Sequence, residues 1–275
     1  MVAGASGFLG RAVVNVLVAR GQDVLAVSRK PAAVAAGIRK QQVEAYRDLV
    51  PPPGAVLIHL AEPNVMSSVE SACDAHEKQV RGELEALLAR KWEHVVYASS
   101  AAVYGDQATH PRDVGETLAP GTVYARAKLK CEDDVIAAGG SVARLSNLYG
   151  PGLAKESLIA EMLAQIPGKG ALQVRAVEPV RDYLWVEDGA RGVADLAMQR
   201  VPGTFNFGSG RGVSVGDLGK MLLACAGEDR AISAAAPARR PSTLVLDVSR
   251  TKVKLGWSPQ VPLESGLKRM LENSR

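Results

Sequence analysis

The sequence predicts an α/β protein with an open, doubly wound parallel sheet and a smaller C-terminal α/β lobe. In the first half of the chain, strand-like and helix-like segments alternate, which is the pattern of parallel strands joined by helices. Residues 55–61 are continuously apolar, as expected of a parallel strand that is buried on both faces. Near the start, a glycine-rich run separates a short apolar segment from a helical one. Ligands of such a sheet bind at the carboxyl ends of its strands.

The composition is that of an ordinary globular protein. The chain has 275 residues, of which 47% are hydrophobic, so it can bury a large core. Its net charge of +4 comes without a Lys/Arg-rich run, and aromatic residues make up only 4%, which argues against nucleic-acid binding. Cys73, Cys131 and Cys225 are far apart and lack metal-ligand spacing, so we expect reduced thiols and no metal site. Without a leader or a membrane-spanning apolar run, we expect a cytoplasmic protein that does not bind membranes.

The first segment reads as a strand, a glycine turn and a helix that covers residues 11–20. Glycines allow a tight turn, and they let backbone N–H groups approach a pyrophosphate at the positive end of the helix. Residues 23–27 then read as a second parallel strand, which predicts a dinucleotide site. The turn residues expected to contact the cofactor are Gly4, Gly7, Phe8, Leu9 and Gly10. Only three residues precede this turn, so either the first strand is short or the chain begins upstream.

The end of the second strand predicts which cofactor is bound. A carboxylate at this place would hydrogen-bond the adenosine ribose and repel a 2′-phosphate. The sequence instead has Ser28 and Arg29, followed by Lys30. This favours NADP(H), with Arg29 binding the 2′-phosphate because its guanidinium can contact two oxygens at once. The alternative is that Arg29 and Lys30 belong to an ordinary solvated loop.

The remaining segments of the first half continue the alternation. We expect strands at residues 43–45, 55–61 and 93–100, and a helix at 67–91. Strand ends near Gly4, Ser28, Ala61 and Ser100 should therefore meet at one edge of the sheet. His59, inside the apolar strand, is expected to be a hydrogen-bonded core residue rather than a ligand.

Tyr124 and Lys128 are the candidate catalytic pair. They are four residues apart in a helical segment, so both side chains project from one face. A lysine ammonium beside a tyrosine phenol favours the phenolate, and such a phenol can give a proton to an alkoxide or take one back. Ser100 could add a hydrogen bond to the same substrate oxygen. The three residues form a set suited to oxidising or reducing a carbinol carbon.

Six motifs occur in the same order as in the extended short-chain dehydrogenases/reductases, and the resemblance covers nearly the whole chain. These are Gly4-x-x-Gly7-x-x-Gly10, His59-Leu60-Ala61, Tyr97-Ala98-Ser99-Ser100 with Tyr104-Gly105, Tyr124-x-x-x-Lys128, Arg144 to Pro151, and Arg181 to Asp188. That family comprises nucleotide-sugar epimerases, dehydratases and ketoreductases. The resemblance implies a Rossmann fold for the first domain, a nucleotide-sugar substrate, and a homodimer formed through helices near residues 67–89 and 124–138.

The resemblance also implies roles for single residues. Gly4, Gly7 and Gly10 would bind the pyrophosphate, Asp48 and Leu49 the adenine, and Leu60 and Ala61 the cofactor backbone. Tyr124 would be the acid/base, Lys128 would bind the nicotinamide ribose, and Ser100 and Asn147 would contact the sugar nucleotide. Glu62 departs from the family, which usually has a small residue after Leu-Ala.

Two features narrow the reaction. Family dehydratases have an Asp-Glu pair after the active-site Ser/Thr, whereas this chain has Ala101-Ala102, and a methyl group cannot move a proton. Residues 240–250 resemble the C-terminal motif of 4-ketoreductases, and Arg240 of this motif could bind the substrate diphosphate. We therefore predict NADP(H)-dependent reduction of a 4-keto nucleotide sugar. The alternatives are an NAD-dependent nucleotide-sugar 4-epimerase, similar to UDP-galactose 4-epimerase, and a non-catalytic dinucleotide-sensing protein.

The second half reads as a more variable lobe that returns once to the first domain. We expect helices at residues 156–165 and 186–198 and strands at 172–177 and 204–207. Ser214 should cap a further helix, and Trp257 should lie in the core. The predicted dinucleotide-binding domain comprises residues 1–150 and 178–206. The substrate-binding lobe comprises residues 151–177 and 207–275.

Overall fold

The computed structural model describes residues 1–31, 34–62, 66–236 and 240–273, and for residues 66–74 it describes the backbone alone. The side chain of Cys73 therefore lies outside the described part of the chain. Of the other cysteines, Cys131 is buried and Cys225 is half-buried. No helix within the described residues combines the length and the apolar character that crossing a bilayer requires.

A seven-stranded parallel sheet forms the centre of the molecule, as the sequence predicts. Its strands are β1 (Val2–Ala3), β2 (Leu25–Ser28), β3 (Arg39–Gln42), β4 (Val56–His59), β5 (His94–Ser100), β6 (Ser141–Leu145) and β10 (Gly203–Phe207). They run in the order β10-β6-β5-β4-β1-β2-β3. The chain therefore moves outward from β1 in one direction to β3 and then in the other direction to β10. This reversal beside β1 leaves a crevice at the carboxyl ends of β1 and β4.

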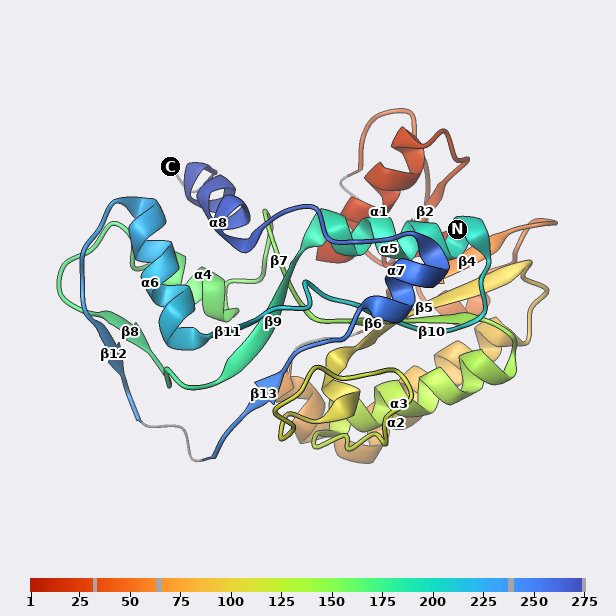
Figure 1. Ribbon diagram of the computed structural model, residues 1–275. Helices are drawn as coiled ribbons and strands as arrows, with labels where there is room; N and C mark the ends of the chain where they lie inside the picture. Colours follow the sequence, from red (N-terminus) through yellow and green to blue (C-terminus); the bar gives the residue numbers. More distant parts are fainter. Residues whose placement is uncertain (32–33, 63–65, 237–239, 274–275) are drawn as a thin grey trace.

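Helices cover both faces of the large sheet (Figure 1). α1 (Phe8–Ala19) and α5 (Val186–Gln199) pack together on one face, and α2 (Met66–Leu88) and α3 (Val123–Ala137) on the other. Apolar side chains of α1 and α5 form the largest core cluster with β1, β4, β5 and β10. Trp257 belongs to this cluster, where its ring meets Phe207 edge to face. The prediction that Trp257 is a core residue is thus confirmed.

The smaller lobe is built on a second sheet. β9 (Val180–Trp185) pairs with β7 (Asn147–Tyr149), β11 (Gly212–Ser214) and β13 (Thr243–Leu244), and β8 (Leu172–Val174) pairs separately with β12 (Ile232–Ala234). The helices of this lobe are α4 (Leu158–Leu163), α6 (Val215–Ala226) and α8 (Leu263–Glu272). A second large apolar cluster holds them together. Ser214 caps α6 as predicted, accepting a hydrogen bond from the backbone N–H of Asp217 at 3.0 Å.

Three short helices complete the fold: η1 (Tyr46–Asp48), η2 (Ala101–Tyr104) and α7 (Ser249–Leu255), which packs against β10. The prediction of a strand at residues 43–45 is wrong, because the edge strand is β3. All four residues of β3 are exposed and polar. β9, which is predicted to belong to the dinucleotide-binding domain, lies in the smaller sheet, whereas α5 directly after it packs on the large one. The division into domains stays a prediction.

Candidate active site

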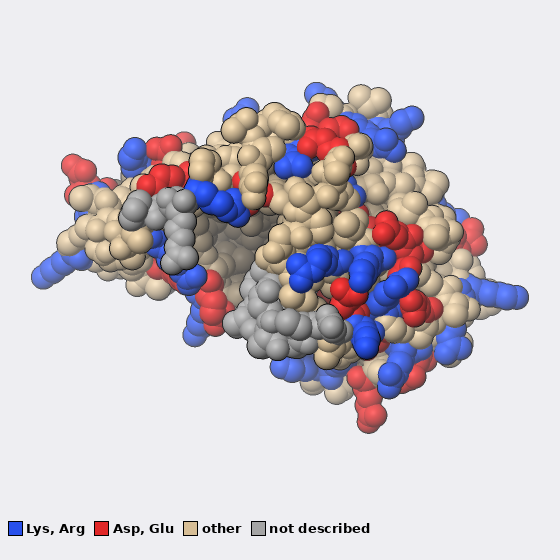
Figure 2. Space-filling model, turned by 90° about the horizontal axis from the view of Figure 1, so that it is seen from below, with Lys and Arg blue, Asp and Glu red and all other residues tan. Residues whose placement is uncertain are grey.

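A cleft of about 810 Å³ lies at the carboxyl ends of β1, β4 and β5, between the large sheet and the smaller lobe. Figure 2 shows a face that is hollowed between these two parts, and Lys and Arg side chains alternate there with Asp and Glu. The predicted site residues that line the cleft are Gly4, Gly7, Phe8, Leu9, Gly10, Leu60, Ser100, Tyr124, Lys128 and Asn147. Segments far apart in the sequence thus meet in one cavity.

The glycine turn between β1 and α1 has the shape of an anion cradle. Gly4 has a φ of +87°, and a Cβ atom on Gly10 would lie 2.1 Å from the carbonyl oxygen of Gly4. α1 begins at Phe8, and its N-cap Gly7 has no side chain that could cap the first turn. The first turn also contains no acidic residue. No side chain therefore occupies the N–H groups at the start of α1, and Phe8, Leu9 and Gly10 line the cleft, an arrangement that fits the pyrophosphate of a dinucleotide.

Tyr124 and Lys128 lie on one face of α3, as their spacing predicts. Thr122 caps this helix by accepting a hydrogen bond from the N–H of Ala125 at 3.1 Å. The helix therefore begins just before Tyr124, and Lys128 follows one turn later. The Lys128 Nζ lies 5.7 Å from the centre of the Tyr124 ring, and it donates to the carbonyl oxygen of Ala98 at 2.6 Å. This bond ties α3 to β5.

Ser100 is the last residue of β5. Its Oγ accepts a hydrogen bond from the backbone N–H of Ala102 at 3.2 Å and so caps η2. A hydroxyl that accepts one hydrogen bond can still donate its own proton. The Ser100 hydroxyl at the cleft wall is therefore able to hold an oxygen atom of a bound molecule.

A buried carboxylate, Glu62, also lines the cleft, and no sequence motif predicts a role for it. Its Oε2 lies 2.7 Å from the Lys128 Nζ, and its Oε1 accepts a hydrogen bond from the Tyr97 hydroxyl at 2.5 Å. Burial alone would raise the pKa of Glu62, but Lys128 and these hydrogen bonds outweigh it and lower that pKa. The pKa of Lys128 is raised, because the effect of Glu62 exceeds the opposing effect of burial. Both groups are therefore charged.

His59, the last residue of β4, precedes Glu62 by three positions and is buried. Its ring stacks on the Tyr97 ring at 6.1 Å, and burial lowers the pKa of His59 to about 4. The expectation of a core histidine is correct, but the expectation that it is fully hydrogen-bonded is wrong. Among the described residues, the His59 Nδ1 finds no hydrogen-bond partner.

Arg181 lines the cleft from the smaller lobe, and the motif in which it occurs does not by itself predict a role for it. Its guanidinium donates to the Ser242 Oγ at 2.6 Å and lies 3.5 Å from Asp106. Arg240, predicted to bind the substrate diphosphate, is not part of the described cleft lining. It pairs instead with Asp106 at 2.8 Å and is 53% exposed. Asp106 thus holds two arginines near the cleft.

The other predicted cofactor residues lie outside the cleft lining. Ser28 is buried, and its hydroxyl donates to the carbonyl oxygen of Lys30 at 2.5 Å. Arg29 is exposed, with its guanidinium 5.7 Å from the centre of the Tyr46 ring. The structure buries Leu49 and Ala61 and leaves Asp48 exposed. Arg29 still lies at the carboxyl end of β2, at the same edge of the sheet as the glycine turn.

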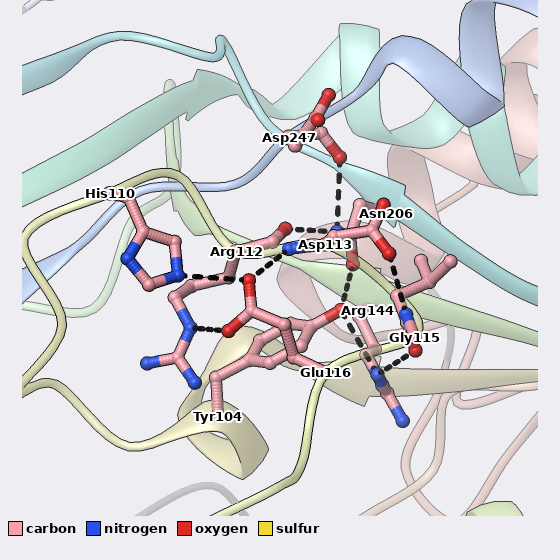
Figure 3. Close-up of polar contacts among 10 residues, drawn as sticks. Tyr104, His110, Arg112, Asp113, Gly115, Glu116, Arg144, Asn206 and Asp247 are labelled. Carbon is pink, nitrogen blue, oxygen red and sulfur yellow. Dashed lines mark hydrogen bonds and ion pairs between the residues drawn. The ribbon is translucent and has the colours of Figure 1, made fainter.

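A separate polar network joins segments that are far apart in the sequence (Figure 3). Arg144 donates to the Tyr104 hydroxyl at 3.0 Å, and this hydroxyl donates to the Asn206 Oδ1 at 2.8 Å. The amide of Asn206 donates in turn to the carbonyl oxygens of Arg112 and Asp247. The network joins η2 to β6, to β10 and to the C-terminal segment.

The parallel sheet, its glycine turn and a cleft at its carboxyl edge define a Rossmann-type enzyme. The chain belongs to the NAD dependent epimerase/dehydratase family, whose model matches residues 1–208. Its homologues are nucleotide-sugar epimerases, dehydratases and reductases of the extended short-chain dehydrogenase/reductase group, as the sequence motifs indicated.

Individual relatives are similar at a moderate level. The chain is 27% identical over 196 residues to the dTDP-4-dehydro-6-deoxyglucose reductase of Escherichia coli. The aligned region covers 66% of this chain and 62% of the reductase. The structure resembles UDP-glucose 4-epimerase of Thermotoga maritima with UDP-glucose, with a TM-score of 0.86, 26% identity and coverage of 100% and 97% of the two chains. It also resembles MoeE5 in complex with UDP-glucose and NAD, with a TM-score of 0.85, 26% identity and the same coverage.

Proposed function

We propose that the protein is an NADP(H)-dependent reductase of a 4-keto nucleotide sugar. The observation that carries this proposal is the common position of Ser100, Tyr124 and Lys128 at one cleft that the glycine turn also lines. The turn and the N-terminus of α1 would hold the pyrophosphate, and Lys128 the nicotinamide ribose. When bound, NADPH supplies a hydride to the keto carbon. The similarity to the Escherichia coli reductase supports this reaction.

The residues of this chain would then stabilise the developing alkoxide. Ser100 and Tyr124 donate hydrogen bonds to the keto oxygen, and Tyr124 transfers its proton to that oxygen as the hydride arrives at carbon. The charge of Lys128 stabilises the phenolate that remains. Asn147 and Arg181, which line the cleft from the side of the smaller lobe, would contact the nucleotide sugar, and the guanidinium of Arg181 suits a diphosphate.

Arg29 carries the preference for NADPH in this proposal. We expect Arg29→Ala to reduce the preference for NADPH over NADH at least tenfold, because the 2′-phosphate loses its bidentate partner. A matched control is Arg250→Ala, because Arg250 is also exposed and also lies 5.7 Å from an aromatic ring, that of Phe205. Fluorescence titration of both cofactors measures this preference. Equal NADPH preference in the Arg29→Ala and Arg250→Ala proteins would contradict the assignment.

The second candidate function is that of an NAD-dependent nucleotide-sugar 4-epimerase. It is favoured by the full-length similarity to the Thermotoga maritima epimerase. In that reaction C4 is oxidised and then reduced on its other face, without net consumption of cofactor. A non-catalytic dinucleotide sensor is less well supported, because Ser100, Tyr124 and Lys128 are all present.

Cofactor release and consumption distinguish the two enzymes. For the reductase, we expect reversible NADPH binding and stoichiometric loss of NADPH absorbance when a 4-keto nucleotide sugar is added. Tyr124→Phe should lower this rate by at least 100-fold, because it removes the proton donor. NAD that copurifies and resists dialysis, together with interconversion of UDP-sugars without added cofactor, would favour the epimerase instead.

A further inference from the structure

Two oxygen atoms from different segments hold the ammonium group of Lys128. Its Nζ lies 2.7 Å from the Glu62 Oε2, and it donates to the carbonyl oxygen of Ala98 at 2.6 Å. A lysine ammonium has three N–H donors. Among the described residues, the structure shows no third oxygen or nitrogen acceptor for this group, and Lys128 lines the cleft. One N–H of Lys128 is therefore left for a bound molecule.

The carboxylate that anchors this ammonium is itself fixed at both oxygens. While its Oε2 meets Lys128, the Glu62 Oε1 accepts a hydrogen bond from the Tyr97 hydroxyl at 2.5 Å. The side chains of Glu62 and Lys128 are each 8% exposed, so water has little access to either group. Tyr97 is fully buried in β5. The protein thus sets the position of the ammonium without help from a ligand.

Two aromatic rings are also close to the ammonium. The Lys128 Nζ lies 4.7 Å from the centre of the Tyr97 ring and 5.7 Å from that of the Tyr124 ring. Such rings attract a positive charge, but a ring face is a weaker hydrogen-bond acceptor than an oxygen atom. A hydroxyl oxygen of a ligand in the cleft would therefore take the third N–H in preference to a ring.

Glu62 also keeps the lysine charged. Burial by itself lowers the pKa of Lys128, and the negative charge of Glu62 is the largest of the influences that raise it. Removal of the carboxylate would therefore lower the pKa of Lys128 and would also release the ammonium from one of its two anchors. Both changes make Lys128 a weaker hydrogen-bond donor.

We propose that Glu62 is a positioning residue that holds the Lys128 ammonium so that its third N–H meets a ribose hydroxyl of the bound dinucleotide. The inference rests on the proposed function, in which Lys128 binds the nicotinamide ribose. Glu62 acts through Lys128 and does not itself bind the cofactor. Its effect on binding is therefore confined to the nicotinamide half of the dinucleotide.

Two ligands separate the halves of the cofactor in calorimetric titrations of the full chain. NADPH contains the nicotinamide ribose, whereas 2′,5′-ADP contains only the adenosine half with its phosphates. We expect Glu62→Gln to weaken NADPH binding about tenfold or more and to leave 2′,5′-ADP binding within about twofold of the wild type. The control is Glu264→Gln, because Glu264 also lies 2.7 Å from a lysine, Lys268, but on the exposed surface of α8. It should change neither affinity.

Lys128→Met tests whether Glu62 acts through the lysine. This change should itself weaken NADPH binding, because it removes the donor. In the Lys128→Met protein, the further change of Glu62 to Gln should then cause no additional loss of NADPH affinity. Equal losses from Glu62→Gln with and without Lys128 would assign Glu62 a general structural effect and would overturn the inference.

Tyr97→Phe provides a second variant in case Glu62→Gln does not fold, which thermal unfolding reveals. It removes the hydroxyl that holds the carboxylate but keeps the ring and every charge. We expect about threefold weaker NADPH binding and unchanged 2′,5′-ADP binding. Wild-type NADPH affinity in a folded Glu62→Gln protein would refute the proposed role, and Tyr97→Phe decides in the same way if that protein does not fold. An equal loss of affinity for both ligands would refute it too.

The outcomes for this inference and for the proposed function can be told apart. If NADPH binding depends on Glu62 as expected but no 4-keto sugar is reduced, the role of Glu62 holds and the proposed reaction is wrong. If the sugar is reduced but NADPH affinity is the same without Glu62, the reaction holds and the inference is wrong. If the wild type binds NADH in place of NADPH, the same comparison is made with NADH and ADP. A protein that binds neither dinucleotide contradicts both.

Discussion

Gly10 shows how a single missing side chain shapes the glycine turn, the proposed cofactor cradle. The helix start can cross the turn closely because Gly10 has no Cβ, which would lie 2.1 Å from the carbonyl oxygen of Gly4. No real Cβ contact is that short, so the backbone would have to move. In the proposed function, the N–H groups of the helix start that follows this turn would bind the pyrophosphate.

We expect Gly10→Ala to weaken NADPH binding at least 100-fold and to lower the free energy of unfolding by about 2 kcal/mol or more. Gly82→Ala is the control, because Gly82 is an exposed residue of α2 with open space around the added methyl group. That change should leave NADPH binding intact and stabilise the helix by about 0.5 to 1 kcal/mol. Calorimetric titration and urea unfolding measure both quantities. Wild-type NADPH affinity in the Gly10→Ala protein would contradict the predicted cradle.

His59 predicts a pH dependence of stability. Its pKa is about 4 in the folded protein, mainly because of burial, and near 6.5 in the unfolded chain. Between these values the unfolded chain binds a proton that the folded protein does not, so stability falls as the pH is lowered from 6.5 to 4. The contribution is of the order of 3 kcal/mol. In urea unfolding, the stability of His59→Phe should therefore fall less steeply over this window than that of the wild type. Identical slopes would show that His59 does not carry the effect.

At the level of elements, a buried ion pair joins β6 to α3, the helix that carries Tyr124 and Lys128. Arg144 and Glu132 lie 2.6 Å apart with side chains 5% and 3% exposed, and Ser99 donates a hydrogen bond to the same carboxylate. Glu132 is one helical turn after Lys128, and Ser99 directly precedes Ser100. The pair thus helps to align α3 with the end of β5.

We expect Arg144→Met to destabilise the protein by about 3 to 5 kcal/mol, because it leaves the carboxylate of Glu132 buried without a cation. Adding Glu132→Gln should recover a large part of this loss, since no lone charge remains. Chemical denaturation of the single and double variants measures both values. If the double variant were as unstable as the single one, or less stable, the loss would come from packing and not from the unpaired charge.

Local sequence patterns predicted most of the elements, and the exceptions have physical causes. The glycine turn, the apolar strand β4 and the helix of Tyr124 and Lys128 are each indicated by a short pattern of neighbouring residues. β3 carries none, because an exposed edge strand of polar residues lacks hydrophobic periodicity. The contact of Glu62 with Lys128 joins residues 66 positions apart (128 − 62), so no local pattern could indicate it. The sequence showed only that Glu62 was unusual.

At the scale of the whole molecule, the cleft is made by two structural units that meet. The large sheet contributes the glycine turn, Ser100, Tyr124 and Lys128, and the smaller lobe contributes Arg181 and Asn147. Sequence motifs identified most of these residues, but their spacing could not indicate that Asp106 would hold both Arg181 and Arg240. The pairing of these side chains depends on the packing of β13 against β9. The homodimer stays a prediction.

Transfer of a labelled hydride tests the central claim most directly. The protein is incubated with NADPH that carries deuterium at the transferable position and with a 4-keto nucleotide sugar, and the product is analysed by mass spectrometry and NMR. We predict one deuterium at C4 of the product for each NADPH consumed, and loss of this transfer in Tyr124→Phe. A product without deuterium, or epimerised sugar formed without consumption of NADPH, would contradict the account.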